Sequence, residues 1–461
     1  MLASMMSRKK YIQEIFFRET NIKKQNMLFI KIIKSFFRGT LFIKLRERYF
    51  ERKLSLSEED VFKKQEILLD RILKHAIKNT VFYSNLFVGN TPKGISDFPI
   101  VNKNIITNRF EEFCSKNKSL YSYYDSFTGG STGEPFHLLR HGGYEYDFGL
   151  KRWKTYGYKD GELLIALDGT KIDNEDLKKN IYWKKKPGRN IPFGTFAVSS
   201  LYYNENNADI YCKYIVDIAP DYIRGYPSFV YAIACYAEKS GWNVGKSVKA
   251  IELTSETAYP YQIEKITSVF GAKVYLQYGH TEACVCANTY DDTYRYRVEP
   301  LYGYVEVLDE NGQHVKEGEV GEVVVTTLHN YAMPLIRYRT GDFAEYGGKD
   351  LRYIYLNRVL GRTQDYIIDI NGNKVLLTAL IFAQHCAALG HITKWQLEQN
   401  TKGKVVAHIV KGKEFSNDDE SEIYELFKKS GNVETVFDYV NEIPLTPRGK
   451  SKMLKQNITL G

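Results

Sequence analysis

The chain has 461 residues, of which 43% are hydrophobic and 26% charged, with 34 Gly, 12 Pro and 6 Cys. This length and composition predict two or three packed domains and exclude collagen-like, intrinsically disordered and disulfide-stapled proteins. The cysteines show no CxxC pair and no metal-ligand spacing, which is typical of free thiols in a reducing, cytoplasmic compartment.

The formal net charge of +9 is concentrated at the N-terminus. Residues 1–53 contain fourteen Lys or Arg and four Glu, so the remainder of the chain is close to neutral. Within this basic N-terminal extension, residues 26–45 place apolar side chains at helical spacings, but no apolar run reaches the roughly 18 residues of a membrane span. The pattern indicates an amphipathic helix that packs on the rest of the protein, contacts the inner face of a membrane peripherally, or binds another partner.

From about residue 54 the sequence alternates helical and β-rich patterns. The helical pattern of residues 61–80 is followed by short β-rich runs such as 162–169 and 249–255. This alternation is typical of layered α/β domains with parallel strands. Residues 54–360 are therefore predicted to form one large α/β domain.

A small β subdomain is expected within this domain, in residues 303–328. Asn311 and Gly312 are predicted to be the two left-handed residues of a tight hairpin between β-branched strands. A further unit, residues 361–461, has the patterns of a small α+β domain. Its predicted elements are strands around 394–399, 405–410 and 435–440 and a helix over 416–431.

The segment SFTGGSTGEPF, residues 126–136, interleaves four hydroxyl side chains with three glycines. Backbone N–H and side-chain O–H groups in such a loop can converge on phosphate oxygens. The loop lacks the GK[ST] ending of a Walker A motif. Taken alone, a segment of this composition is more often a flexible connection, so phosphate binding rests on the motifs that follow it.

A second polar group follows a predicted buried strand at residues 273–276. Tyr278, His280, Thr281 and Glu282 are expected at the carboxyl end of that strand, where open α/β sheets bind ligands. Tyr278 is suited to stacking on a base and Glu282 to holding Mg²⁺, whereas the alternative is a turn with an exposed acid.

Three more residues have chemistry suited to a nucleotide. Asp342 follows a dense polar cluster and can accept hydrogen bonds from both ribose hydroxyls, and Arg362, at the predicted domain junction, can pair with phosphate. Lys450 follows a Pro/Thr/Gly-rich loop, a position where a lysine is usually just solvated.

The ordered motifs TGGSTGEP, YGHTE, IRYRTGD, GRTQD and PRGK together resemble the adenylate-forming superfamily of acyl-CoA synthetases, nonribosomal adenylation domains and luciferases. Within it, the chain is similar to the phenylacetate-CoA ligase branch, especially to members found in capsular polysaccharide biosynthesis. The similarity extends over roughly residues 60–455. It implies an ATP- and acyl-binding domain, residues 54–360, and a mobile C-terminal domain, residues 361–461, that carries the lysine.

The resemblance implies an ATP site built from several of these motifs. A loop would hold the β- and γ-phosphates, and it comprises Thr128, Gly129, Gly130, Ser131, Thr132 and Gly133. Tyr278 and Gly279 would flank the adenine, and Asp342 would accept the ribose hydroxyls.

The catalytic residues that the resemblance implies surround the α-phosphate. Thr281 would contact it, Glu282 would bind Mg²⁺, and Arg362 would support ribose and phosphate. Lys450 would reach both the α-phosphate and the substrate carboxylate. The implied reaction is attack of a carboxylate on the α-phosphorus of ATP, which gives an acyl-adenylate and pyrophosphate and depends on orientation and charge neutralisation.

The acyl pocket is expected, by the layout of the family, at Tyr226, Ser228, Ser255, Glu256 and His280. Sequence alone does not name the acid that the pocket binds.

The chain departs from the family pattern at several positions. Phe136 replaces the common lysine at the end of the phosphate loop, Gln364 stands at the hinge, and the loop to Gly372 is longer. Cys284 and Cys286, near the site, are interpreted as core residues rather than zinc ligands.

The sequence thus predicts an ATP-dependent carboxylate ligase that transfers the acyl group to an amine or hydroxyl in surface polysaccharide biosynthesis. Transfer to coenzyme A is the alternative, because no sequence feature specifies the acceptor. A non-catalytic nucleotide-binding scaffold docked on a membrane is a second class. Nucleic-acid binding is a third, but no aromatic-basic stacking module is visible and no nucleic-acid partner is expected.

Overall fold

The structure is a computed structural model that describes residues 57–128, 136–141, 144–186, 191–362, 366–377 and 386–458. The basic N-terminal extension with its predicted amphipathic helix therefore lies outside the described residues, as does most of the predicted phosphate loop. In the part of the chain that is described, none of the helices combines the length and apolarity that crossing a bilayer requires.

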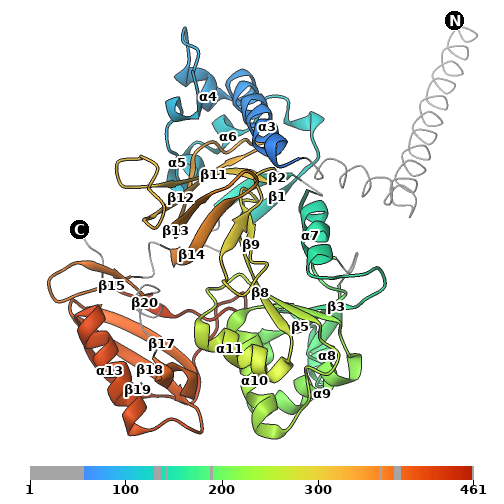
Figure 1. The fold of residues 1–461 in the computed structure, drawn as a ribbon, viewed down its shortest axis with the longest axis vertical. Helices are drawn as coiled ribbons and strands as arrows, with labels where there is room; N and C mark the ends of the chain where they lie inside the picture. Colours follow the sequence, from blue (N-terminus) through green and yellow to red (C-terminus); the bar gives the residue numbers. More distant parts are fainter. Residues whose placement is uncertain are drawn as a thin grey trace, which may run out of the picture. The chain divides into compact units, whose positions relative to one another are not determined.

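One twelve-stranded sheet organises the large domain, with the strand order β11-β12-β13-β14-β10-β9-β8-β7-β6-β3-β5-β4 (Figure 1). Strands β3, β5, β6, β7 and β8 run parallel, as the sequence predicts. The half of the sheet that contains these parallel strands also includes β4, which pairs antiparallel with β5. It comprises β3 (Leu164–Asp168), β4 (Trp183–Lys185), β5 (Phe196–Ser199), β6 (Tyr222–Gly225), β7 (Ala250–Thr254) and β8 (Lys273–Gly279). The antiparallel half comprises β9 (Cys286–Asn288), β10 (Tyr296–Val298), β11 (Gly303–Leu308), β12 (Val320–Thr327), β13 (Tyr338–Lys349) and β14 (Ile354–Arg362).

The remaining elements among the described residues of this domain are a two-stranded ribbon and a set of helices. The ribbon pairs β1 (Tyr123–Thr128) with β2 (Phe136–His141). The α-helices are α3 (Glu58–Asn79), α4 (Val81–Leu86), α5 (Lys103–Asn108), α6 (Phe110–Phe113), α7 (Tyr144–Thr155), α8 (Asn174–Leu177), α9 (Ala208–Ile218), α10 (Pro227–Ser240) and α11 (Pro260–Phe270). Three short 3₁₀ turns lie at Ile95–Asp97, Lys118–Leu120 and Ser200–Tyr202.

Alternation along the parallel strands separates an apolar face from a charged one. Ile223, Ile251 and Leu253 belong to the buried cluster that includes α10 and α11. Because successive side chains of a strand point to opposite faces, Arg224 and Glu252 lie on the other face. Pro at the first turn and a left-handed Gly at the C-cap delimit both α10 and α11, which fixes where each helix meets the sheet.

The expected β subdomain is correct in pattern but is not a separate sheet, because β9–β14 continue the parallel strands. The predicted hairpin is wrong in detail. Gly312 has a φ of +75°, whereas Asn311 is not left-handed. The Asp309 carboxylate accepts hydrogen bonds from the N–H groups of Asn311 (2.9 Å) and Gln313 (2.8 Å), which closes a longer turn.

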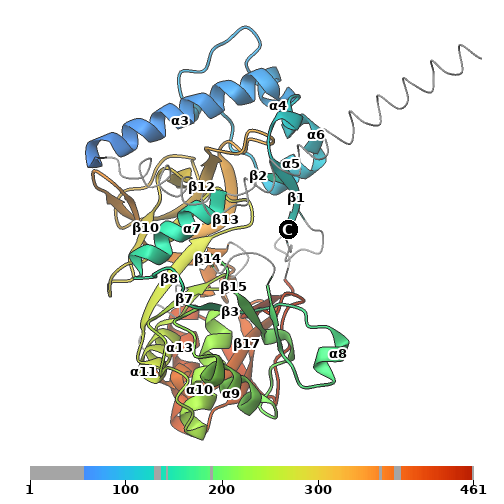
Figure 2. The same cartoon turned by 90° about the vertical axis from the view of Figure 1, so that its right-hand side faces the viewer.

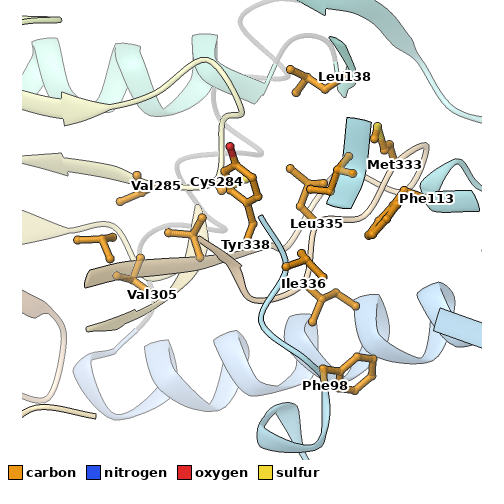
Figure 3. Close-up of a cluster of buried hydrophobic side chains, with 14 of the residues drawn as sticks. Phe98, Phe113, Leu138, Cys284, Val285, Val305, Met333, Leu335, Ile336 and Tyr338 are labelled. Atoms are coloured by element: carbon orange, nitrogen blue, oxygen red, sulfur yellow. The ribbon is translucent and has the colours of Figure 1, made fainter. Parts of the chain in front are cut away.

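The main hydrophobic core lies under the antiparallel strands. Figure 3 shows Phe98, Phe113, Met333, Leu335 and Tyr338, from segments far apart in the sequence, gathered in this core. Helix α3 contributes apolar residues to the same cluster and runs along this end of the domain (Figure 2). The regular packing of these side chains gives the antiparallel half a rigid base for the residues that it presents to the site.

The C-terminal domain has its own four-stranded sheet in the order β19-β18-β17-β20 (Figure 1). Its hydrophobic cluster also includes Tyr259 of the large domain. The C-terminal domain contains β15 (Tyr366–Ile368), β16 (Lys374–Leu376), β17 (Ile392–Thr401), β18 (Lys404–Lys411), α13 (Asn417–Gly431), β19 (Glu434–Tyr439) and β20 (Leu454–Gln456), with a 3₁₀ turn at Ala387–His391. The Ser416 side chain caps α13 by accepting from the Asp419 N–H. These elements confirm the predicted α+β pattern, and β20, which pairs parallel to β17, is an additional strand.

Candidate active site

A cavity of about 1500 Å³ lies where the carboxyl ends of β7 and β8, strand β13 and the C-terminal segment 444–453 meet. Motifs that are far apart in the sequence therefore line one space. The predicted site residues in its wall are Ser228, Ser255, Glu256, Tyr278, Gly279, His280, Thr281, Glu282, Asp342 and Lys450.

Tyr278 and Asp342 form one side of the cavity. The Tyr278 hydroxyl donates a hydrogen bond to Asp342 Oδ2 at 2.9 Å, and the Asp342 N–H donates to Thr340 Oγ1 at 3.0 Å. On the neighbouring strand, Arg362 is the register partner of Asp342. Asp342 is buried, so its carboxylate is held in a fixed orientation beside an aromatic ring.

Glu282 lies in the turn after β8 and is held from two sides. The Tyr338 hydroxyl donates to Glu282 Oε1 at 3.0 Å, and His280 Nδ1 lies 3.1 Å from Glu282 Oε2. Burial would raise the pKa of Glu282, but His280 and the hydrogen bonds outweigh burial and lower its pKa to about 2. Glu282 therefore carries a full negative charge at the cavity wall at any physiological pH.

A single ionised carboxylate is compatible with Mg²⁺, which usually takes one or two protein carboxylates together with phosphate oxygens and water. Among the described residues, no group of three or more His, Cys, Asp or Glu is arranged to hold a metal. Glu282 thus fits an ion that arrives with a phosphate group better than an ion that the protein binds by itself.

Phe136, which stands where the family commonly has a lysine, is fully buried at the start of β2. Its ring stacks on that of Tyr338, with the centroids 5.9 Å apart. Because the Tyr338 hydroxyl holds Glu282, Phe136 supports the site from the core and presents no charge to the cavity.

Lys450 comes from the C-terminal domain and its side chain reaches the wall formed by the large domain. Its Nζ donates to the Ser255 carbonyl at 3.0 Å and lies 5.5 Å from the centroid of the Tyr226 ring. Tyr226 thus lies beside the lysine, although it is not part of the cavity wall.

Glu256 connects the two domains next to Lys450. Its carboxylate accepts hydrogen bonds from the Ser451 N–H at 2.7 Å and from the Ser228 N–H at 3.1 Å, at the start of α10. Burial raises the pKa of Glu256, and these hydrogen bonds only partly oppose the shift. The residue predicted for the acyl pocket therefore acts here as a contact between the domains.

Two glycines let the lysine-bearing segment approach the large domain closely. A Cβ at Gly169 would overlap the Arg448 carbonyl, and a Cβ at Gly449 would overlap Ser200 and Gly169. Gly449 also has a φ of +69°, which disfavours other residues. The Arg448 guanidinium donates to the Phe127 carbonyl at 2.9 Å, immediately before the predicted phosphate loop.

For some predicted site residues the structure describes no side chain. Gly129, Gly130, Ser131, Thr132 and Gly133 lie outside the described residues, as does Gln364. Thr128 and Arg362 are described in their backbones, as the last residues of β1 and β14. Their predicted roles stay predictions.

Of the two cysteines near the site, Cys284 belongs to the hydrophobic core, as predicted, whereas Cys286 also lines the cavity. Cys284 and Cys286 are buried, and all six cysteines are free thiols. Burial raises the pKa of both thiols, which keeps them protonated and unreactive.

Sequence reasoning missed the arginines that line the cavity, among them Arg152 on α7 and Arg224 on β6. Both contact the buried carboxylate of Glu252. The available signal was the charged residue in the apolar strand Tyr222–Gly225, since a lysine or arginine inside a buried strand is rare without a partner.

Several solved structures resemble this chain in fold. 2-Hydroxyisobutyryl-CoA ligase in the postadenylation state, in complex with R3-HIB-AMP, matches with a TM-score of 0.66 and 15% identity over 86% of this chain and 90% of that chain. An acyl acid amido synthetase in complex with 2,4-DB matches with a TM-score of 0.56 and 14% identity over 86% of this chain and 89% of that chain. The fold is that of the adenylate-forming ligases, as predicted.

Two proteins and one family are similar to this chain in sequence. Protein CapK of Staphylococcus aureus is 26% identical over 459 residues, which cover 91% of this chain and 95% of that protein. Phenylacetate-coenzyme A ligase of Thermus thermophilus is 29% identical over 170 residues, 33% of this chain and 37% of that protein. The family described as the CapK C-terminal domain matches residues 367–457. These similarities confirm the predicted resemblance to the adenylate-forming superfamily and its phenylacetate-CoA ligase branch.

Proposed function

We propose that this chain is an ATP-dependent ligase that activates a carboxylic acid as an acyl-adenylate with release of pyrophosphate. The observation that supports the proposal best is that Lys450, from the C-terminal domain, lines the same cavity as Glu282 and Asp342 from the large domain. In the proposed site, Lys450 would be the mobile cation, Glu282 the acid that binds the metal, and Asp342 the acid that binds the ribose.

In the proposed reaction, a carboxylate oxygen attacks the α-phosphorus of ATP, and the bond from that phosphorus to the bridging oxygen breaks as pyrophosphate leaves. Asp342 orients the ribose and Tyr278 stacks on the adenine, which fixes the α-phosphorus in position. Lys450 offsets the repulsion between the two anionic reactants. Mg²⁺ at Glu282 supplies further charge neutralisation when bound.

For the second step, we propose transfer of the acyl group to an amine or hydroxyl in surface polysaccharide biosynthesis. The similarity to Protein CapK over nearly the whole chain supports the capsule setting of this proposal, and the amine or hydroxyl acceptor is the part that the assay below tests. Coenzyme A is the second candidate, because a phenylacetate-coenzyme A ligase is among the relatives and the matched 2-hydroxyisobutyryl-CoA ligase is also solved in complex with CoA.

We also propose that the C-terminal domain turns between an adenylating and an acyl-transferring arrangement near Gln364. The match to 2-hydroxyisobutyryl-CoA ligase has a TM-score of 0.66 for the postadenylation state and 0.53 for the thioesterification state. The contacts of Lys450 and Ser451 with the large domain support the first arrangement for this structure.

The proposed function is tested by a pyrophosphate-release screen over carboxylic acids with ATP and Mg²⁺. Each acid is assayed with hydroxylamine, which traps an acyl-adenylate as the hydroxamate, and with and without coenzyme A. We expect pyrophosphate and hydroxamate in equal amounts for the correct acid. Absence of both products over a broad panel would contradict the adenylation proposal, and a strict requirement for coenzyme A would decide the acceptor.

The hydrogen bond between Tyr278 and Asp342 gives a separate prediction. Asp342→Ala is expected to raise the KM for ATP by about 10- to 100-fold, because hydrogen bonds to a charged group contribute about 1.5–3 kcal/mol. Tyr278→Phe keeps the ring and is expected to raise it by less than about 5-fold. Equal effects of the two variants in a pyrophosphate-release titration would show that Asp342 acts through Tyr278 and not on the ribose.

A further inference from the structure

Two guanidinium groups share one carboxylate at the cavity. Glu252 is fully buried, and it accepts hydrogen bonds from Arg152 and, at 2.9 Å, from the Nε of Arg224. Burial opposes the charge of Arg152, but Glu252 outweighs burial and raises the pKa of Arg152, so Arg152 stays charged. The cluster therefore has two positive charges and one negative charge.

This surplus differs from the neighbouring ion pairs, which are balanced. Arg140 pairs with Glu145, and Lys151 pairs with Glu299 at 2.8 Å. In the part of the chain that the structure describes, Glu252 is the one carboxylate within ion-pair distance of Arg152 or Arg224. A surplus charge that is removed from water is costly unless a counter-charge approaches it.

The two arginines of this cluster face the cavity. Arg152 and Arg224 both line the cavity, and only 18% of the Arg224 side chain is exposed. The Arg224 guanidinium lies over the ring of Phe193, 5.7 Å from its centroid, which holds it in place. An arginine fixed in this way presents its remaining N–H donors to whatever occupies the cavity.

Arg224 also lies next to the position of Lys450. Its Nη2 lies 3.5 Å from Thr254 Oγ1, and the carbonyl of the next residue, Ser255, accepts from Lys450 Nζ. Lys450 and the arginine pair therefore share one stretch of the cavity wall, with the Glu256 carboxyl group beside Lys450.

We propose that the acid substrate carries a second anionic group, a carboxylate or a phosphate, which binds to Arg224 and Arg152 while its reacting carboxylate faces Lys450. This inference rests on the proposed function, and it names the class of acid that the enzyme activates. The second anion completes the charge balance that Glu252 leaves incomplete, and charge-assisted hydrogen bonds from a guanidinium group to carboxylate or phosphate oxygens are strong. An acid with an uncharged tail would leave the surplus positive charge of the cluster without a counter-charge.

The test compares dicarboxylic acids and phosphate-bearing carboxylic acids with their uncharged counterparts, such as a dicarboxylic acid and its monoamide. Wild-type protein, Arg224→Gln, Arg224→Lys and Lys151→Gln are assayed for pyrophosphate release. Lys151→Gln is the matched control, because it removes a cation that adjoins Arg152 in α7 but does not line the cavity. Thermal unfolding of each variant checks that the fold is intact.

We expect wild-type kcat/KM to be about 10- to 100-fold higher for the dianionic acid than for its monoamide. Arg224→Gln should abolish that preference by lowering kcat/KM for the dianion alone, Arg224→Lys should restore part of it, and Lys151→Gln should keep it. An equal loss for both acids in Arg224→Gln, or a wild-type preference for the monoamide, would overturn the inference and assign the arginines to the support of the sheet.

Calorimetric titration of the same acids without ATP separates this inference from the adenylation proposal. Binding of the dianion that Arg224→Gln weakens, combined with no pyrophosphate release from any acid, would support the arginine site and contradict the proposed reaction. Pyrophosphate release with no preference for the dianion in either assay would support the proposed reaction and contradict the arginine site.

Discussion

Replacement of Lys450 by alanine is expected to lower the rate of acyl-adenylate formation by about 10²- to 10³-fold, which is the usual effect of losing one preorganised electrostatic donor. The Lys450 ammonium group reaches the cavity wall at the Ser255 carbonyl, 3.0 Å away, and so it is already in place before the substrates meet. In the proposed reaction Lys450 acts on the charge of the transition state and not on the nucleoside, so the affinity for ATP should change by less than about 3-fold. Pyrophosphate release and a separate ATP-binding titration measure the two quantities.

The control for this variant is Lys429→Ala. Lys429 is in the same C-terminal domain, on α13, where its side chain is 72% exposed and pairs with Glu425. An exposed pair of this kind contributes little to stability, so both activity and thermal unfolding should stay near wild type. Wild-type turnover in Lys450→Ala, or an equal loss in both variants, would contradict the catalytic role of Lys450.

The sequence predicted most elements of the fold because their signals are local. Ser416 caps α13, and Pro and Gly delimit α10, all within a few residues of the helix ends. The hairpin at Asn311 was mispredicted because the Asp309 side chain competes for the turn N–H groups. Strand β20 has only three residues and is defined by its pairing with β17, so no local sequence pattern predicts it.

The order of the motifs predicted that Tyr278, Glu282, Asp342 and Lys450 gather around one space, and all four line the same cavity. Their roles in catalysis and binding stay predictions. The arginine pair was not predictable in this way, because its shared carboxylate is about a hundred residues from Arg152 in the chain and no spacing connects them. Such long-range ion pairs depend on which strands become neighbours, here β6 and β7.

The second large effect is expected for Glu282→Gln. A neutral amide is a weaker ligand for Mg²⁺ than a carboxylate, so kcat/KM should fall by roughly 10²-fold at fixed Mg²⁺, and the Mg²⁺ concentration for half-maximal rate should rise. The buried environment adds to this effect, because Tyr338 and His280 are arranged around a charged carboxylate. Initial rates over a Mg²⁺ series measure both quantities, with Glu310→Gln, at the exposed turn after β11, as the control.

The lowered pKa of Glu282 makes the same substitution a test of stability. The folded-state pKa is about 2, below the ordinary value of 4.5, so the native state favours the ionised carboxylate. Its contribution to stability is therefore fully present above about pH 4.5 and is lost as the pH falls toward 2. Relative to wild type, Glu282→Gln should lower the free energy of unfolding most at neutral pH, and the difference should shrink in acid. A difference that is constant from neutral pH to pH 3 would mean that Tyr338 and His280 do not hold Glu282 in its charged form.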